Sequence, residues 1–239
     1  MFAHPDDESF SGVGTAMKYA AAGAQVVLAT ATRGERGKRG DPPLCSLQEL
    51  GACRERELRD AAAIAGFHEL HVLGYRDREL ADAPPDEVRR ALVSLIRRVR
   101  PAVVVTFDPH GFNLHPDHVA ISRFTSDAIA AAADSRWLED AGPAHGVRRL
   151  VWTPPVPPWE TARASRLADL HGADFVLDVS AWRDGRVAAL RAHRTQHLSV
   201  DKYFFNQPDP NRIFDTEIWR QAWGPALSGR PADDLFVGL

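Results

Sequence analysis

The stretch AVVVTF, residues 102–107, is a short run of β-branched residues without charge, which is typical of a strand buried on both faces of a sheet. Four further apolar, β-branched runs occur along the chain: AQVVLATA (24–31), ELHVLGY (69–75), RRLVWTP (148–154) and ADFVLDVS (173–180). Helical patterns separate the early runs, which favours a parallel sheet covered by helices. We therefore predict a doubly wound, three-layer α/β/α fold, Rossmann-like, with a mostly parallel sheet.

Three helices are predicted, over residues 11–22, 46–65 and 86–99. Gly23 and Gly66 follow the first two and are suited to end them, and Ser46 and Glu49 have capping-box spacing at the start of the second. No repeat, low-complexity tract or convincing linker divides the chain. The Pro-rich TPPVPPWE, residues 153–160, is predicted to be a loop near the sheet edge, so we expect one domain over residues 1–239.

The composition points to a small-molecule partner. The chain carries 29 basic and 32 acidic residues without a long run of either sign, which favours neither nucleic acid nor an anionic membrane. No apolar stretch approaches the roughly 18 to 20 residues of a membrane span, and no signal peptide is visible, so a cytoplasmic protein is expected. Cys45 and Cys53 are expected to be reduced. Homo-oligomerisation stays open.

The first strand is unusually short. Only Met1 and Phe2 precede the polar sequence AHPDDE, whereas a doubly wound fold normally begins with a full buried strand. We expect either that this strand is a stub or that the given sequence begins inside it.

Two polar segments are candidates for chemistry. In AHPDDE, His4 and Asp7 are three residues apart, and Pro5 restricts the backbone between them. The second segment, TFDPHGFNLHPDH (106–118), leaves the carboxyl end of the AVVVTF strand and delivers His115, Asp117 and His118. Ligands of doubly wound sheets bind at the carboxyl ends of the strands, so this is where an active site is expected.

Together the two segments supply two imidazoles and a carboxylate, the usual ligand set of a catalytic zinc and also one that suits ferrous iron. Asp6, next to the ligand Asp7, could act as general base, and His115 could polarise a carbonyl or protonate a leaving amine. Asp117 could orient His115. Each short motif alone is common, but their joint occurrence after strands favours a metal site.

At these residues the chain resembles the PIG-L/LmbE-like zinc-dependent N-deacetylases, whose two signature motifs are AHPDDE and HPDH. The resemblance extends to TRGERG (32–37), RERELRDAAAIAGF (54–67), LGYRD (73–77), TFDPHG (106–111) and ALRAHRTQ (189–196). It covers most of the chain in the expected order.

The resemblance implies a role for each residue of the two motifs. His4, Asp7 and His118 would bind zinc, and Asp6 would be the general base. His115, supported by Asp117, would stabilise the tetrahedral oxyanion and assist departure of the amine. The expected reaction removes the N-acetyl group from an N-acetylglucosamine-type substrate and releases acetate.

Family members hold the sugar with three residues that Ser11, Arg54 and Asp77 match in position. In the mycothiol-pathway branch, the loop before HPDH carries a Tyr where this chain has Asn113, which can donate one hydrogen bond but cannot act as an acid. His193 could reach the metal region or be a hydrogen-bonded helix histidine.

Two alternatives remain at this point. The same site would suit an amidase that cleaves a larger acyl or cysteinyl amide from an amino-sugar conjugate. The chain could also be a non-catalytic sugar-binding relative, although Asp6, His115 and all three expected ligands are present.

Overall fold

The structure, a computed structural model, describes residues 1–154, 157–161 and 172–239. Of the Pro-rich segment predicted as a loop, residues 155 and 156 lie outside the described residues. The strands are β1 (Val27–Thr32), β2 (Glu69–Tyr75), β3 (Val103–Thr106), β4 (Arg149–Trp152), β5 (Phe175–Asp178) and β6 (Thr216–Trp223). The helices are α1 (Asp7–Ser11), α2 (Val13–Ala21), α3 (Leu50–Ala65), α4 (Pro85–Val99), α5 (Gly111–Leu114), α6 (Pro116–Ala133), α7 (Pro158–Thr161), α8 (Arg183–Ala192), α9 (His197–Val200) and α10 (Pro210–Asp215).

The strands form a mixed sheet with a parallel centre. β1 pairs with β2 in parallel, and β3 pairs with β4 in parallel. β6 then runs antiparallel to both β4 and β5, giving the order β3-β4-β6-β5. The prediction of an α/β fold with a parallel sheet is confirmed, and the antiparallel β6 is an addition to it.

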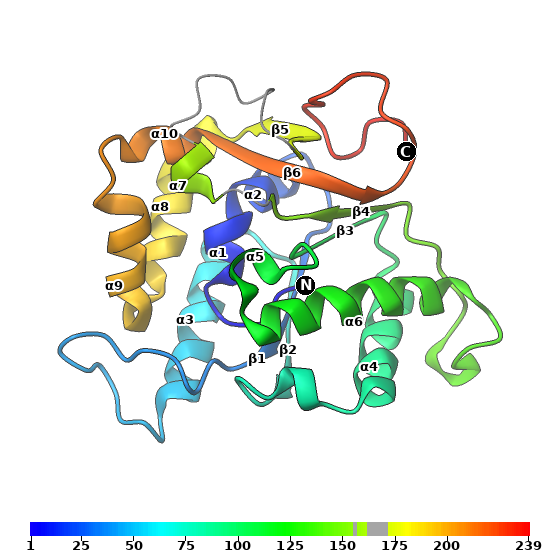
Figure 1. Cartoon of the computed structure of the whole chain (residues 1–239), viewed down its shortest axis with the longest axis horizontal. Helices are drawn as coiled ribbons and strands as arrows, with labels where there is room; N and C mark the ends of the chain where they lie inside the picture. The colour runs from blue at the N-terminus through cyan, green and yellow to red at the C-terminus, as the bar shows by residue number, and fades with distance from the viewer. Residues whose placement is uncertain (155–156, 162–171) are drawn as a thin grey trace.

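Residues 1–3 join the two groups of strands. The N–H of Phe2 donates to the carbonyl of Ala29 in β1 at 2.9 Å, and the N–H of Ala31 donates to the carbonyl of Phe2 at 2.9 Å. On the other side, the amino group of Met1 donates to the carbonyl of Val105 in β3 at 2.7 Å. These three residues thus occupy the place of a first strand, at the centre of the sheet (Figure 1).

Beyond Met1, β1 and β3 do not pair with each other. An apolar cavity of about 350 Å³ is lined by residues of both strands, among them Val27 and Val103, and by Leu95 and Trp219.

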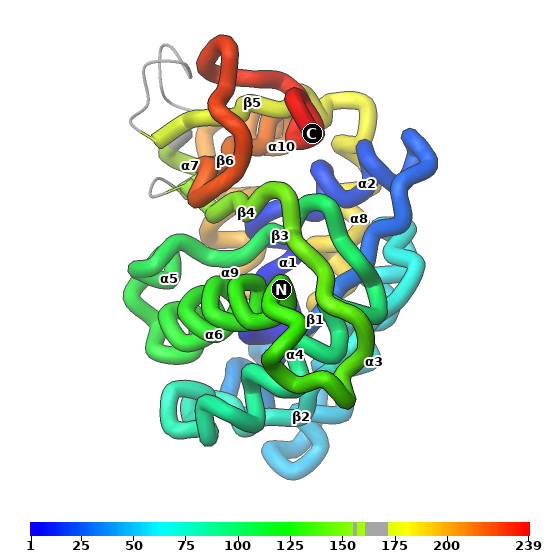
Figure 2. The backbone as a smooth tube through the Cα atoms, turned by 90° about the vertical axis from the view of Figure 1, so that its right-hand side faces the viewer, coloured from blue at the N-terminus to red at the C-terminus, as the bar shows by residue number. Residues whose placement is uncertain are grey.

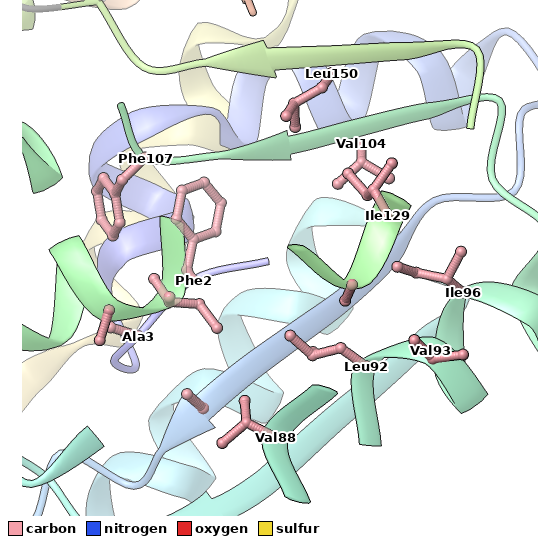
Figure 3. Packing of buried hydrophobic residues seen from close by; sticks show 14 of the residues in the cluster. Phe2, Ala3, Val88, Leu92, Val93, Ile96, Val104, Phe107, Ile129 and Leu150 are labelled. Atoms are coloured by element: carbon pink, nitrogen blue, oxygen red, sulfur yellow. The ribbon is translucent and has the colours of Figure 1, made fainter. Parts of the chain in front are cut away.

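Helices cover both faces of the sheet, as Figure 2 shows from the side. α4 and α6 pack on one face, where Phe2, Phe107 and Val104 meet Leu92 and Ile129 (Figure 3). On the other face, α2, α3 and α8 pack together through a second cluster of apolar side chains: Val13, Met17, Ala61, Ala65 and Ala189. The site residues therefore stand on a rigid three-layer frame.

All three predicted helices are present, and each begins or breaks at a different residue from the predicted one. The helix over residues 11–22 is divided at Gly12, which has a non-helical backbone. The ring of Trp219 lies so close to Gly12 that a Cβ there would be 2.5 Å from it. Ser46 and Glu49 form the capping-box hydrogen bonds, but the helix itself starts at Leu50. The third helix, α4, starts one residue before its predicted start and ends where predicted.

Among the described residues, no helix is long and apolar enough to cross a membrane.

Candidate active site

Three chain segments meet at the carboxyl ends of the central strands. His4 to Glu8 follow the short strand formed by residues 1–3, and Asp77 follows β2. His115 and His118 stand at the start of α6, which follows β3. The two predicted motifs, more than a hundred residues apart in sequence, thus lie side by side, as expected for a doubly wound sheet.

The three predicted metal ligands converge. Nδ1 of His4 lies 3.1 Å from Nε2 of His118. The same Nε2 of His118 lies 3.3 Å from Oδ1 of Asp7. Nδ1 of His4 lies 3.6 Å from Oδ2 of Asp7. Ligand atoms bound about 2.0–2.1 Å from a tetrahedral metal stand roughly 3.3 Å apart, and the two separations at Nε2 of His118 are close to this value, whereas His4 approaches the other oxygen of Asp7.

Hydrogen bonds orient the imidazoles of His4 and His118 so that one nitrogen of each ring faces the proposed metal position. Nε2 of His4 faces Oδ1 of Asp77 at 3.2 Å and Oδ2 of Asp117 at 3.1 Å, while Nδ1 of His118 faces the carbonyl of Gly111 at 3.1 Å. Each ring can donate its N–H to these oxygens, which leaves the other nitrogen as a lone-pair donor at the site. The donor set therefore fits a divalent cation.

The electrostatics agree with a site for positive charge. Burial lowers the pKa of His4, but hydrogen bonds to Asp117, Asp7 and Asp77 outweigh it and raise that pKa well above its usual value. Burial raises the pKa of Asp7, but the charges and hydrogen bonds of His118 and His4 outweigh it and hold that pKa well below its usual value. The buried carboxylates thus stabilise a cationic centre.

Other combinations of ligand atoms are also close. Two groups of three described side chains have potential ligand atoms within 4.8 Å of one another: His4, His115 and His118, and His4, Asp77 and Asp117. Both share His4, and the second uses the nitrogen that faces away from His118.

Asp117 differs from its predicted contact. Its carboxylate accepts hydrogen bonds from the backbone N–H groups of Arg78 and Leu80 and faces His4, instead of supporting His115. The link to His115 runs through the backbone, because the N–H of Asp117 donates to Nδ1 of His115 at 3.2 Å. This geometry arises because His115 caps α6, which turns its ring back toward the first helical N–H groups.

The ring of His115 is half-buried beside the predicted ligands, 4.8 Å from the ring of His4 between centroids. Burial and the positive charges of His4 and His118 lower the pKa of His115. A ring in this position can exchange a proton with a bound molecule near neutral pH.

Asp6 is held by its surroundings in an unusual conformation. Its φ of 110° lies in the left-handed region, which non-glycine residues rarely adopt. Oδ1 of Asp6 lies 3.3 Å from Nη2 of Arg54. Burial raises the pKa of Asp6 to about 6, with Arg54 opposing the rise and Asp7 adding to it. A carboxylate with such a pKa is a suitable proton acceptor near neutral pH.

A cavity of about 380 Å³ opens above these groups. Its lining includes the four predicted substrate-binding residues: Ser11, Arg54, Asp77 and Asn113. The guanidinium of Arg54 donates to the carbonyls of Gly34 and Pro5, whereas its buried Nε has no hydrogen-bond partner among the described residues. Oδ1 of Asn113 accepts from the N–H of His115 at 3.1 Å, which supports the loop.

Sequence reasoning assigned no role to several residues at this site. Glu8 pairs with His193, whose Nε2 lies 2.7 Å from Oε1 of Glu8. Phe107 stacks on His118 with ring centroids 4.0 Å apart, and Trp159 and Tyr203 stack on each other at the wall of the cavity. Glu8 belongs to the AHPDDE motif, and a hydrogen-bonded histidine was one of the two expectations for His193. The stacking of Phe107, Trp159 and Tyr203 is visible only in the fold.

Comparisons with known proteins agree with this arrangement. The sequence model of the family described as GlcNAc-PI de-N-acetylase matches residues 1–129. The 1D-myo-inositol 2-acetamido-2-deoxy-alpha-D-glucopyranoside deacetylase of Kribbella flavida is 33% identical, over 99% of this chain and 96% of the relative. The conserved protein TT1542 from Thermus thermophilus superimposes with a TM-score of 0.70 and 27% identity, over 95% of this chain and 94% of that one. N,N'-diacetylchitobiose deacetylase from Pyrococcus horikoshii, 21% identical, shares the fold with a TM-score of 0.71, over 92% of this chain and 81% of that one.

Proposed function

The chain belongs to the GlcNAc-PI de-N-acetylase family, and from this membership and the site we propose that it is a metal-dependent amide hydrolase. It removes the N-acetyl group from an N-acetylglucosamine-type substrate and releases acetate. The observation that carries the proposal is the convergence of His4, Asp7 and His118 within 3.1 to 3.6 Å of one another at the floor of the cavity.

We assign the metal to His4, Asp7 and His118, and we propose zinc, with ferrous iron as the alternative that the same donors suit. Asp7 is preferred to His115 as the third ligand because its carboxylate lies close to the facing nitrogens of both imidazoles. When bound, such a metal lowers the pKa of a water from about 15.7 toward about 7 and polarises the acetyl carbonyl.

Asp6 carries the proton transfers, and His115 stabilises the developing charge. Asp6 accepts a proton from the attacking water, a role supported by its place in the lining of the cavity and by its pKa of about 6. His115 donates a hydrogen bond to the oxygen on which negative charge develops, and removing one donor of this kind typically costs about 3 to 4 kcal/mol. The departing amine takes up the proton that Asp6 accepted, and His115 assists its departure by keeping its Nε2 N–H on the developing carboxylate oxygen.

The remaining residues of the cavity hold the sugar. We propose that Ser11, Asp77 and Asn113 contribute polar contacts, and that Arg54 contributes the part of its guanidinium that faces the cavity. The substrate is a small amino sugar or its conjugate, of the class named for the Kribbella relative. The predicted single domain and cytoplasmic location stay predictions.

Acetate release tests the proposal. Purified protein is incubated with N-acetylglucosamine and with the N-acetylglucosaminyl-inositol compound named for the relative, with and without chelator. Acetate release that chelator abolishes and zinc restores is the expected result. Fully metal-loaded protein that releases acetate from neither compound would overturn the assignment.

A further inference from the structure

We infer that Glu8 and His193 act as positioning residues that hold Asp6 in its strained backbone conformation and thereby aim its carboxylate at the reacting water. The inference rests on the proposed function, in which Asp6 is the general base.

The strain at Asp6 requires support. A φ of 110° with a ψ of −28° is strained for a non-glycine residue and persists only when neighbouring contacts enforce it. The carbonyl of Asp6 accepts hydrogen bonds from the N–H groups of Ser9 and Phe10, both at 2.9 Å. These bonds fix one side of the Asp6 backbone.

Glu8 fixes the other side. The N–H of Asp6 donates to Oε2 of Glu8 at 3.1 Å, so the side chain two residues further along determines which way the Asp6 peptide faces. Glu8 is 2% exposed, so little water can compete for its carboxylate. Rotation of the Asp6 peptide would leave both the N–H and a buried carboxylate oxygen without this bond.

His193 fixes Glu8 in turn. It follows α8, and its Nε2 lies 2.7 Å from Oε1 of Glu8, while the hydroxyl of Ser9 donates to the same oxygen at 2.6 Å. The side chain of His193 is fully buried. The conformation of Asp6 is therefore connected, through two hydrogen bonds in series, to a helix from the last third of the chain.

A purely structural role would look similar in a stability measurement, so the test needs a matched control. Glu217 provides it: this buried carboxylate pairs with Arg186 at 3.0 Å and accepts from the N–H groups of Gly14 and Thr15. It has the same kind of partners as Glu8 but no contact with Asp6.

The experiment compares Glu8→Gln and Glu217→Gln in the zinc-loaded protein, with N-acetylglucosamine as substrate. kcat, KM, zinc content and Tm are measured, and the crystal structure of Glu8→Gln gives φ of Asp6. We expect kcat of Glu8→Gln to fall about 100-fold with KM and zinc content unchanged, because a misplacement near 1 Å costs about that much. Glu217→Gln should lose Tm but keep kcat within about threefold. In Glu8→Gln, φ of Asp6 should move to a negative value.

A second pair keeps the test decisive if Glu8→Gln does not fold. His193→Gln retains a donor near the position of Nε2 and should keep kcat, whereas His193→Ala should lose it. Any of three results would overturn the positioning role. The first is an equal kcat for His193→Gln and His193→Ala, and the second is an equal loss of kcat in Glu8→Gln and Glu217→Gln. The third is an unchanged φ of Asp6 in Glu8→Gln. If the wild-type protein releases no acetate, the proposed function fails by itself, and φ of Asp6 still decides the positioning role.

Discussion

Nε2 of His4 lies 3.1 Å from Oδ2 of Asp117, so a residue of the second motif orients the imidazole that we propose as a metal ligand in the first. The same carboxylate accepts two backbone N–H groups that follow β2, and it is fully buried. Asp117 is thus the point at which three segments of the site are held together.

Replacing Asp117 by Asn should weaken metal binding by about 10- to 100-fold, the usual cost of losing such a support of a metal-bound imidazole. Zinc affinity measured by competition with a chelating dye checks this. Asp127→Asn is the control, because Asp127 lies on the same helix but its side chain is 44% exposed and pairs with Arg89. Equal zinc affinities for both variants would contradict the role of Asp117.

Replacing Asp6 by Asn should lower kcat by about 10²- to 10⁴-fold, since an amide cannot accept the proton of the attacking water. Zinc should stay bound at one ion per chain, because the carboxylate of Asp6 faces Arg54 and is not one of the assigned ligands. Acetate release and elemental analysis on the same sample give both values. Near-full activity at full zinc occupancy would show that another group is the base.

Removing the metal should lower stability as well as activity. An ion that binds only the folded chain stabilises it by about 2.7 kcal/mol when its free concentration is a hundred times Kd. The chelated protein should therefore have a lower Tm, which zinc restores. His118→Ala serves as the control and should show no zinc-dependent rise in Tm, because it removes one of the three assigned ligands. A zinc-dependent rise of wild-type size in this variant would contradict the ligand assignment.

Replacing Gly37 by Ala should disturb Arg54, because a Cβ at this position would overlap the guanidinium. Arg54 is 4% exposed and contacts both Pro5 and Asp6, so the displacement should reach the base. We expect a loss of about 1–3 kcal/mol in the free energy of unfolding, the usual cost of overpacking, together with slower acetate release.

Gly146→Ala is the matched control for Gly37→Ala, because no atom lies within 4 Å of a Cβ at Gly146. Its free energy of unfolding should change by no more than about 0.5 kcal/mol. Denaturant unfolding and kcat/KM measure both variants. If Gly37→Ala behaves like Gly146→Ala, the packing of Arg54 does not constrain the site.

The residues within each short motif were predictable from sequence, because their spacing fixes their local geometry. His4 and Asp7 are held together by a turn in which Oδ2 of Asp7 accepts from the N–H of His4 at 2.7 Å. The contacts of Asp117 and Glu8 were not predictable, since they depend on how distant segments pack. His193, for example, is separated from its partner Glu8 by 185 positions in the sequence.

Most of the sheet could also be predicted, and β6 was missed for a physical reason. Its sequence, TEIWRQAW, contains Glu217 in a buried position. This charged residue interrupts the run of apolar residues from which a buried strand is predicted. That carboxylate is stabilised by Arg186 and by two backbone N–H groups of α2, none of which can be inferred from the strand itself.

The position of Met1 decides how this chain can be labelled. Its amino group points between β1 and β3, beside the apolar cavity of about 350 Å³, in the middle of the molecule (Figure 1). A purification tag attached to Met1 would replace the amino group that donates to Val105, beside Val27 and Val103 in the lining of the apolar cavity. Leu239 ends at the periphery, and a tag fused there leaves the centre of the sheet untouched.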